Sequence, residues 1–257
     1  MFTAGLDIGS RMTKAVLFDI RQNKILGTRI SDTGIKPGET SMLLLNELLE
    51  EYGIKKEQLS GIASTGYGRR RLDIAEIQIP EISCHALGVH FLIPNARTVI
   101  DIGGQDSKVI SINENGKVLD FVMNDKCAAG TGRFLEIVSE ILDTDVEGLS
   151  IIAESADDVV ALSNTCVVFA ESEIIGLIAE GVEPGVIAAS VYESVASRVR
   201  QLASSLKLED DIVFTGGVAQ ATGACKAMSR ILNTQVLIPS IPSYTGALGA
   251  ALKAVNR

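Results

Sequence analysis

The sequence lacks paired cysteines and is poor in histidine. Its cysteines are at positions 84, 127, 166 and 225, and no two of them form a C-x-x-C spacing. This absence excludes simple zinc knuckles and the cysteine pattern of single-chain ferredoxins. The H-E-x-x-H, G-x-S-x-G and H-R-D motifs are missing as well, so metalloprotease, serine-hydrolase and protein-kinase chemistry is not indicated. His85 and His90 are the only histidines, and a packing role is expected for both.

Positive charge and long apolar runs are also scarce. The formal net charge is −9 at pH 7, and no basic stripe with interleaved aromatics is present, so nucleic acid is a poor partner. Arg69–Arg71 is the one basic run; such a run is usually a solvated face, with docking to a partner protein as the alternative. No apolar stretch suits a membrane span or a signal peptide, so we expect a cytoplasmic protein without structural disulfides.

What the chain does contain is an alternation of short strands and helices. Hydrophobic residues make up 46% of its 257 positions, which is enough for two lobes with large buried cores. The pattern predicts an α/β protein with one duplicated lobe: residues 1–94, then 95–257, with the last helix, near 246–257, packing back on the first lobe. Strands are expected at 2–9, 13–20, 24–31, 59–64, 212–214 and 235–238, with a second meander of strands over 97–123. Helices are expected at 39–52, 83–91, 131–142, 168–181, 184–206 and 223–232.

The clearest motif occurs twice. Leu6–Val16 recurs as Ile100–Ile110 with a constant offset of 94 positions. Corresponding residues are Asp7 and Asp101, Gly9 and Gly103, Thr13 and Ser107, and Lys14 and Lys108. In each copy an apolar run ends in an acid, turns on small residues and resumes. This pattern predicts a β-hairpin whose tip offers backbone N–H groups to a phosphate, because glycine allows close approach, while the acid can hold a metal ion through water.

The repetition decides how this motif is interpreted. A single D-x-G turn is commonly only a hairpin, whereas two matching copies favour two related lobes that bind one nucleotide from opposite sides. A third glycine loop, Thr215–Ala219, follows a short strand and precedes a helix, which suits contact with the adenosine or its ribose. Alone this loop is a weak signal, but with the two hairpins it completes a nucleotide pocket.

Two of the cysteines precede predicted helices. Cys127 comes shortly before the Gly130–Gly132 break and its helix, and Cys166 comes just before the next helix. Free N–H groups and the helix dipole at such positions favour a thiolate and suit an anionic metal cluster. Two cysteines cannot hold a four-iron cluster, but two pairs brought together across a twofold axis can. On spacing alone, both also fit small buried residues.

Together these motifs resemble the ATP-dependent activator component of the 2-hydroxyacyl-CoA dehydratases. That family is a branch of the superfamily that unites actin, acetate and sugar kinases and heat-shock chaperones. The most specific run is Asn124–Glu136, which ordinary sugar kinases of the superfamily lack. Other matching segments are Leu6–Lys14, Thr65–Arg69, Glu81–Ala86, Ile100–Asp106, Cys166–Glu173, Ser194–Arg198, Phe214–Gln220 and Gly246–Ala251.

The resemblance implies two actin-like (ribonuclease-H-like) lobes with a nucleotide cleft between them. It also implies an ATPase coupled to electron transfer: a homodimer with one oxygen-sensitive [4Fe-4S] cluster on the cysteines that match Cys127 and Cys166. Reduced ferredoxin or flavodoxin would be the electron donor, and the dehydratase component would receive one low-potential electron as ATP is hydrolysed. ATP binding would change the angle between the helices behind the cluster.

The expected nucleotide site combines the two hairpins with the third glycine loop. Asp7 and Asp101 would hold Mg²⁺ through water, and Gln105 or Asp106 would orient the attacking water. The residues expected to contact the nucleotide are Ser10, Arg11, Met12, Thr13, Lys14, Gly103, Gly104, Gln105, Gly130, Thr131, Gly132, Arg133, Gly216, Gly217 and Gln220. Arg11 and Met12 are bulkier than expected for such a loop, but backbone donors would bind the phosphate.

Other functions remain open at this point. The partner could be a benzoyl-CoA-type reductase, whose activating subunits share this fold, and the sequence does not identify the acyl-CoA. A small-molecule (sugar) kinase of the same fold would use one carboxylate as a base toward a sugar hydroxyl and would contain no iron. An actin-like filament or a chaperone ATPase is disfavoured by the small size and the absence of a substrate-binding domain.

Overall fold

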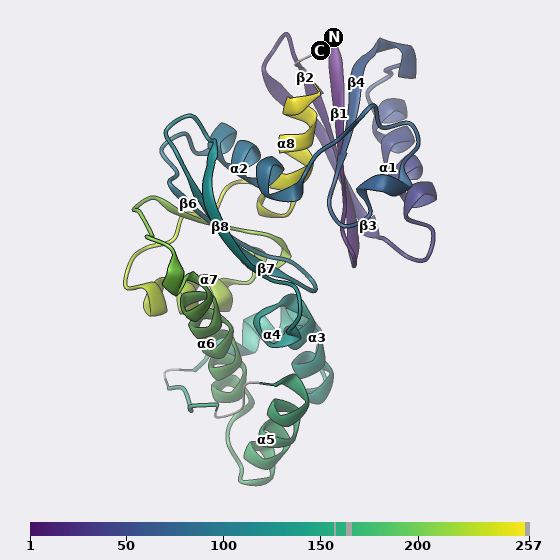
Figure 1. Cartoon of the computed structure of the whole chain (residues 1–257). Helices are drawn as coiled ribbons and strands as arrows, with labels where there is room; N and C mark the ends of the chain where they lie inside the picture. Colours follow the sequence, from purple (N-terminus) through teal and green to yellow (C-terminus); the bar gives the residue numbers. More distant parts are fainter. Residues whose placement is uncertain (157, 163–165, 255–257) are drawn as a thin grey trace. The chain divides into compact units, whose positions relative to one another are not determined.

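Figure 1 shows the chain as a computed structural model, which describes residues 1–156, 158–162 and 166–254. The chain divides into two compact units, each with its own sheet. The first unit contains Met1–Arg97, Ile112–Leu119 and the segment from Pro239 onward, and the second contains Thr98–Ser111 and Asp120–Ile238. The first unit therefore takes in two segments from beyond residue 94, one of which holds the C-terminal helix.

The first unit is built on a sheet with the strand order β3-β2-β1-β4-β5. These strands are β1 (Phe2–Ile8), β2 (Met12–Asp19), β3 (Lys24–Asp32), β4 (Leu59–Thr65) and β5 (Ile77–Gln78). The first three form an antiparallel meander, and β4 is parallel to β1. The central strand β1 is buried from its second residue to its last, as expected for a strand that is covered on both faces.

Helices α1 (Pro37–Glu51) and α8 (Thr245–Lys253) cover opposite faces of this sheet (Figure 1). Leu17 of β2 belongs to the core cluster that includes the leucines of α1, whereas its neighbour Phe18 packs with Leu248 of α8. This alternation follows from the strand geometry, because successive side chains point to opposite faces.

Helix α8 also packs closely against α2 (Glu81–Leu92) at glycines. A Cβ atom on Gly249 would overlap the carbonyl group of Cys84, and one on Gly88 would overlap the carbonyl oxygen of Thr245. On its other side, a Cβ atom on Gly5 of β1 would overlap the backbone of α8. The small residues thus let α8 lie in backbone contact with both β1 and α2.

The second unit is built on a sheet with the order β8-β7-β6-β9. Its strands are β6 (Thr98–Ile102), β7 (Ser107–Ile112), β8 (Val118–Asn124) and β9 (Ile212–Thr215). β7 is antiparallel to β6, whereas β9 is parallel to it. The strand expected at 235–238 is wrong: this segment makes a single bridge, between Leu237 and Val213.

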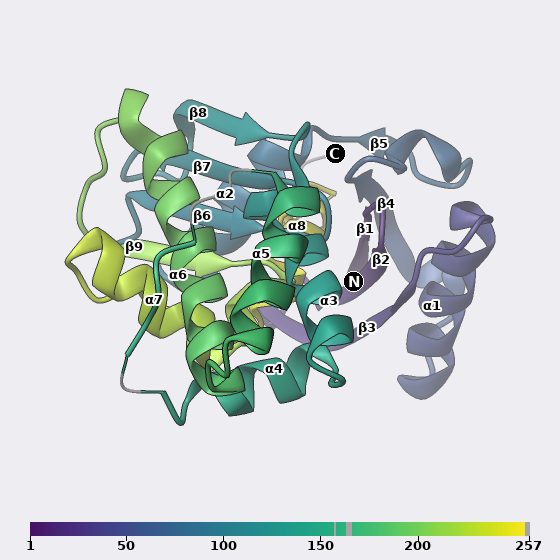
Figure 2. The ribbon, with the colours of Figure 1, turned by 90° about the horizontal axis from the view of Figure 1, so that it is seen from below.

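The helices of this unit are α3 (Gly132–Ile141), α4 (Val146–Ala153), α5 (Val167–Ala179), α6 (Pro184–Leu202) and α7 (Thr222–Leu232). Figure 2 looks at the sheet from the helical side, with α3, α5 and α6 in front of the strands. Helix α5 packs on α3 and α6. No helix in the described part of the chain is long and apolar enough to cross a membrane.

The contact between α8 and α2 makes a stability prediction. Gly249→Ala should lower the free energy of unfolding by about 1–3 kcal/mol, because the new methyl group meets backbone atoms that cannot move aside. Gly217→Ala serves as the control, since a Cβ atom there has no neighbour within 4 Å, and it should change stability by less than about 0.5 kcal/mol. Urea unfolding followed by circular dichroism measures both, and equal losses would contradict the packing described.

Candidate functional site

The two copies of the repeated motif form hairpins in the same register. Asp7 of β1 pairs with Lys14 of β2, and Asp101 of β6 pairs with Lys108 of β7. The lysine Nζ is 3.3 Å from Asp7 Oδ2 in the first hairpin and 3.2 Å from Asp101 Oδ2 in the second. The predicted hairpins and their correspondence are confirmed.

Each acid also lies beside a parallel strand that ends in threonine. β4 places Thr65 next to Asp7, and β9 places Thr215 next to Asp101. Both acids are therefore at the carboxyl ends of a pair of parallel strands. In α/β proteins, this is the edge at which ligands bind.

The glycine after each of these threonines extends the repeat further. The backbone φ is 84° at Gly66 and 89° at Gly216, a region that residues other than glycine rarely adopt. A Cβ atom would overlap the carbonyl oxygen of Ile8 in the first case and that of Ile102 in the second. The repeated Thr-Gly pair in the sequence was the signal for this second correspondence, and analysis of the hairpins alone missed it.

A buried charge network surrounds the acid of the second unit. Lys108, whose side chain is 1% exposed, lies 3.2 Å from Asp101 and 2.8 Å from Asp106. The hydroxyl of Thr215 donates to Asp101 Oδ1 at 3.0 Å. One ammonium group thus lies between two carboxylates beside a glycine loop, and carboxylate oxygens are ligands that suit a divalent cation. Sequence reasoning assigned no separate role to Lys108, although the offset of the repeat pointed to it.

Three of the expected nucleotide segments come together in the second unit. The N–H of Gly132 donates to the carbonyl oxygen of Gly103 at 2.9 Å, and that of Arg133 donates to Gly104 at 2.8 Å. A Cβ atom on Gly132 would lie 3.5 Å from Val218 Cγ2. The second hairpin, the start of α3 and the third glycine loop therefore meet at one edge of the sheet.

Some of the expected phosphate donors are used within the hairpins. The N–H of Gly9 donates to Met12 O at 3.1 Å, and the N–H of Gly103 donates to Asp106 O at 2.9 Å. Among the described residues, the N–H groups of Ser10, Gly104 and Gln105 have no hydrogen-bond acceptor and can serve an anion. The exposed members of the expected set are Ser10, Arg11, Gln105, Gly217 and Gln220.

Two expected hydroxyl groups face the protein interior. Thr13 is buried, and its Oγ1 lies 3.0 Å from Thr33 Oγ1. Thr131 is also buried and donates to the carbonyl oxygen of Ala128 at 2.8 Å. Both side chains therefore support the loops. Gly130, buried as well, packs under the Arg198 side chain.

The four cysteines fall into two groups. Cys127 and Cys166 are exposed, whereas Cys84 is buried and Cys225 is half-buried. Burial raises the pKa of the Cys84 thiol from 9.0 to about 12, and a hydrogen bond with Thr65 offsets part of this effect. Burial also raises the pKa of Cys225. Cys84 and Cys225 therefore remain neutral thiols near neutral pH, and neutral thiols are poor metal ligands.

The helix N-termini at the exposed cysteines differ. Cys166 is the N-cap residue of α5, as expected. Cys127 instead precedes a short 3₁₀ turn, Ala128–Gly130, and the N–H groups of Gly132 and Arg133 that open α3 are taken by the hairpin carbonyls. The N–H groups that open α3 are therefore not available to Cys127, which is instead the N-cap residue of the 3₁₀ turn.

Asn124 holds the backbone of Cys127 in place. Its Oδ1 accepts the Cys127 N–H at 3.0 Å, and its Nδ2 donates to the Cys127 carbonyl oxygen at 2.7 Å. Next to this loop is a cavity of about 240 Å³. It is lined by Ser107, Asn124, Cys127, Gly130, Arg198, Gln201 and Leu202. One cavity thus touches both the second hairpin and the cysteine loop.

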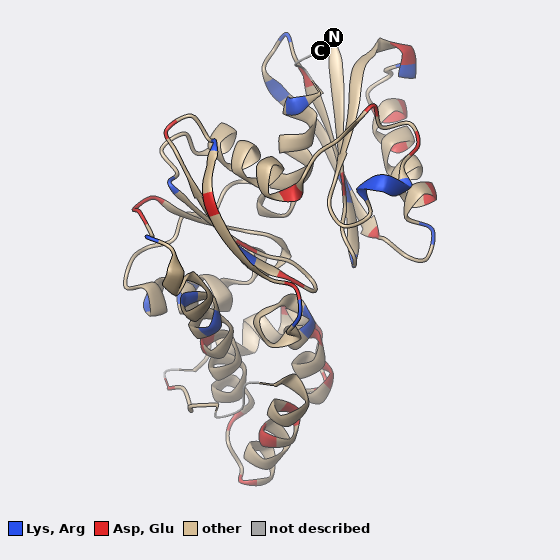
Figure 3. Ribbon diagram, in the orientation of Figure 1, with Lys and Arg blue, Asp and Glu red and all other residues tan. Residues whose placement is uncertain are grey.

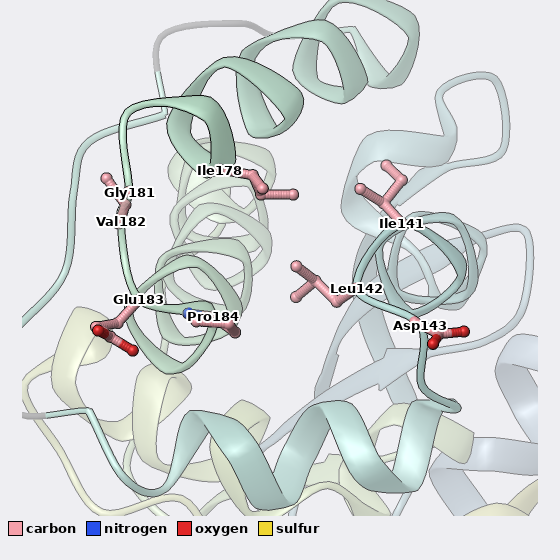
Figure 4. Close-up of a pocket in the computed structure, with 8 residues that line it drawn as sticks. All are labelled: Ile141, Leu142, Asp143, Ile178, Gly181, Val182, Glu183 and Pro184. Atoms are coloured by element: carbon pink, nitrogen blue, oxygen red, sulfur yellow. The ribbon is translucent and has the colours of Figure 1, made fainter.

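A second cavity, of about 390 Å³, lies at the far ends of the helices that follow the cysteines. Figure 4 shows Leu142, just after α3, and Ile178 of α5 pointing toward this space. The carboxylates of Asp143 and Glu183 lie at its sides. The charged residues in its lining are both acidic, so this cavity offers little to a phosphate.

Comparison with known proteins gives a consistent result over the full chain. The model of the BadF/BadG/BcrA/BcrD ATPase family matches residues 4–254. The 2-hydroxyisocaproyl-CoA dehydratase activator of Clostridioides difficile is 44% identical over 256 residues, which cover 100% of this chain and 96% of that protein. The activator of lactoyl-CoA dehydratase of Anaerotignum propionicum is 45% identical over 254 residues, which cover 99% of this chain and 97% of that protein.

A solved structure of similar sequence supports the fold. The activator of the 2-hydroxyisocaproyl-CoA dehydratase from Clostridium difficile with bound ADPNP superposes with a TM-score of 0.93 at 44% identity, covering 99% of this chain and 94% of that one. The expected actin-like α/β fold is confirmed.

The buried charge network predicts unequal roles for the two hairpin lysines. Lys108→Met should lower the free energy of unfolding by about 3–5 kcal/mol, because it removes a buried ammonium group that lies between two carboxylates. Lys14→Met should cost less, about 1–3 kcal/mol, since the Lys14 side chain is 18% exposed whereas that of Lys108 is 1% exposed. Chemical denaturation measures both losses. Adding Asp106→Asn to Lys108→Met should restore part of the loss, and no restoration would contradict this network.

Proposed function

Because the chain belongs to the BadF/BadG/BcrA/BcrD ATPase family, we propose that it is the ATP-hydrolysing activator of a 2-hydroxyacyl-CoA dehydratase. Its task is to deliver one low-potential electron to that enzyme. The observation that carries this proposal is the combination, in one chain, of a phosphate-binding hairpin pair with two exposed cysteines. A sugar kinase would need the hairpins but would have no use for the cysteines.

The nucleotide chemistry rests on the residues at the strand ends. Asp7 in the first unit and Asp101 in the second are each proposed to hold Mg²⁺ through water, because buried carboxylates are the oxygen ligands that this ion prefers. Mg²⁺ would neutralise charge on the phosphates when bound with ATP. The free N–H groups of Gly104 and Gln105 bind the phosphates, and Gln105 or Asp106 orients the attacking water.

The nucleoside is assigned to the third glycine loop. Gly217 and Gln220 are exposed at the carboxyl end of β9, and a Cβ atom on Gly217 would have no neighbour within 4 Å. This open surface gives a flat base or ribose room to approach the backbone. Gly216 supplies the turn itself, and Gly132 packs behind the loop.

The cysteines fit a shared iron–sulfur cluster. A [4Fe-4S] cluster needs four thiolates, and each chain offers Cys127 and Cys166 at its surface. Two chains related by a twofold axis would complete the set. Such a cluster would supply a one-electron carrier of low potential. Oxygen sensitivity follows from its exposure, and the reducing cytoplasm is the compartment that suits it.

Helix α5 offers the surface for that homodimer. Val168 and Phe169 are 67% and 63% exposed, and Ile175 and Ile178 are exposed as well. The charged residues of this helix are all acidic (Figure 3). This number of exposed apolar side chains on one helix calls for a partner, and a second copy of α5 is the one that would bring two Cys166 residues together.

The start of α3 provides the coupling between nucleotide and cluster. Any shift of Gly103 and Gly104 on phosphate binding pulls on the N–H groups of Gly132 and Arg133. Cys127 is only five residues earlier in the chain. At the far end, the cavity beside Leu142 and Ile178 leaves space for α3 and α5 to change their angle. ATP can therefore act as a switch between two helix arrangements.

The partners follow from this role. The dehydratase component would dock where the cluster is exposed, and reduced ferredoxin or flavodoxin would supply the electron. The direct test uses a purified 2-hydroxyacyl-CoA dehydratase that lacks its activator. We expect the reduced, iron-loaded protein with ATP and Mg²⁺ to start dehydration, and neither ADP nor a non-hydrolysable ATP analogue to do so. A phosphorylated sugar product without iron would instead indicate a kinase.

The cluster itself predicts a pattern among cysteine variants. Cys127→Ser and Cys166→Ser should each abolish it, because each removes two of its four ligands from the dimer. Cys84→Ser and Cys225→Ser are matched controls that should keep it. Iron analysis and absorbance after anaerobic purification measure the result, with about four irons expected per dimer and bleaching in air. About four irons per monomer, or an intact cluster in either of the first two variants, would refute the shared site.

A further inference from the structure

His85 lies beside the acid of the first hairpin. Its side chain is buried on α2, at the place where α8 begins. A Cβ atom on Gly246 would be 3.1 Å from His85 Nε2 and 3.2 Å from Asp7 Oδ2. The imidazole and the carboxylate therefore face the same glycine.

The orientation of the ring is fixed by its other nitrogen. His85 Nδ1 lies 3.0 Å from the hydroxyl oxygen of Thr245, which is itself fully buried. Nε2 is 3.6 Å from the carboxylate of Glu81, one turn earlier on α2. With Nδ1 bonded to Thr245, the ring presents Nε2 to Glu81 and to Gly246, the glycine that the Asp7 carboxylate also approaches. Such anchoring through one nitrogen is how proteins set the direction of the other.

The surrounding backbone leaves the ring little freedom. Gly88 of α2 lies against the Thr245 carbonyl group and Gly249 of α8 against that of Cys84, so the two helices are in backbone contact near the ring. Gly246 itself admits no side chain without displacing the imidazole or the Asp7 carboxylate by a few tenths of an ångström. A rigid support of this kind is what a precisely placed polar atom needs.

We propose that His85 is a positioning residue for the metal-binding end of the nucleotide site. Nε2 hydrogen-bonds to the water shell through which Asp7 holds Mg²⁺, and Nδ1 keeps the ring in place. This inference rests on the proposed metal role of Asp7. It goes beyond the packing role expected for both histidines, and it assigns a function to the Glu81–Ala86 motif.

Two conservative variants separate the functions of the two nitrogens. In His85→Asn the side-chain amide can take the place of Nδ1, and in His85→Gln it can take the place of Nε2. The proposal predicts that His85→Gln keeps the apparent Mg²⁺ affinity within about threefold, whereas His85→Asn loses about 10–100-fold. The readouts are the Mg²⁺ dependence of ATP hydrolysis and, apart from turnover, the tightening of ATP binding by Mg²⁺ in calorimetry. Affinity for ATP in excess EDTA should change in neither variant.

His90 provides the matched control, because it is the other histidine of α2 and packs over Gly116. His90→Asn and His90→Gln should leave the Mg²⁺ dependence unchanged. Should His85→Asn fail to fold, Thr245→Val releases the ring and should weaken Mg²⁺ binding by at least about threefold.

Three results would decide against the proposal. The first is that His85→Asn keeps the wild-type Mg²⁺ dependence, the second that only His85→Gln loses Mg²⁺ affinity, and the third that both variants lose it equally. Each would mean that His85 only links α2 to α8. If Mg²⁺ fails to tighten ATP binding in the unaltered protein, the metal role of Asp7 fails instead, and iron content still tests the activator function separately.

Discussion

Two backbone hydrogen bonds hold the functional parts of the second unit together. The N–H groups of Gly132 and Arg133, at the start of α3, donate to the carbonyl oxygens of Gly103 and Gly104 in the phosphate hairpin. The first N–H groups of a helix need acceptors from outside the helix, and here the hairpin supplies them. Because Gly132 has no side chain, its backbone can come this close. The hairpin and the segment that carries Cys127 are therefore joined through their backbones.

Two features hold Asp7 and Asp101 in place: the glycine turns next to them and the lysines that face them. The Thr-Gly turns after β4 and β9 let the chain pass directly over the ends of β1 and β6, and these turns enclose Asp7 and Asp101. Removing a carboxylate from water is costly unless a cation faces it, and each hairpin supplies a lysine from its own second strand. The result is a pair of acids that are buried, oriented and close to free backbone donors. A phosphate with its metal ion needs all three properties.

Much of this arrangement could be predicted from the sequence, because it depends on local patterns. The repeat at an offset of 94 gave the two hairpins, and the spacing before α5 placed Cys166 at a helix start. The segment 235–238 pairs with β9 at one position, through the backbone of Leu237, and this single bridge is too short for a strand. Helix α4 was missed because eight residues are too few for a clear helical period. The acceptors of the α3 N–H groups and the neighbours of His85 come from segments distant in sequence, and no local signal reports them.

The central claim is that nucleotide state reaches Cys127 through the start of α3. Hydrogen exchange at the amides of Gly132 and Arg133 tests it directly, because those two protons form the connection. Exchange would be followed in the cluster-loaded dimer with ATP and Mg²⁺, with ADP and Mg²⁺, and without nucleotide. We expect exchange at both amides to differ by at least about fivefold between the ATP and ADP states, in line with ordinary coupling free energies of ~1–3 kcal/mol, while the amide of Leu6 in β1 stays unchanged. Identical exchange at Gly132 and Arg133 in all three states would contradict the claim.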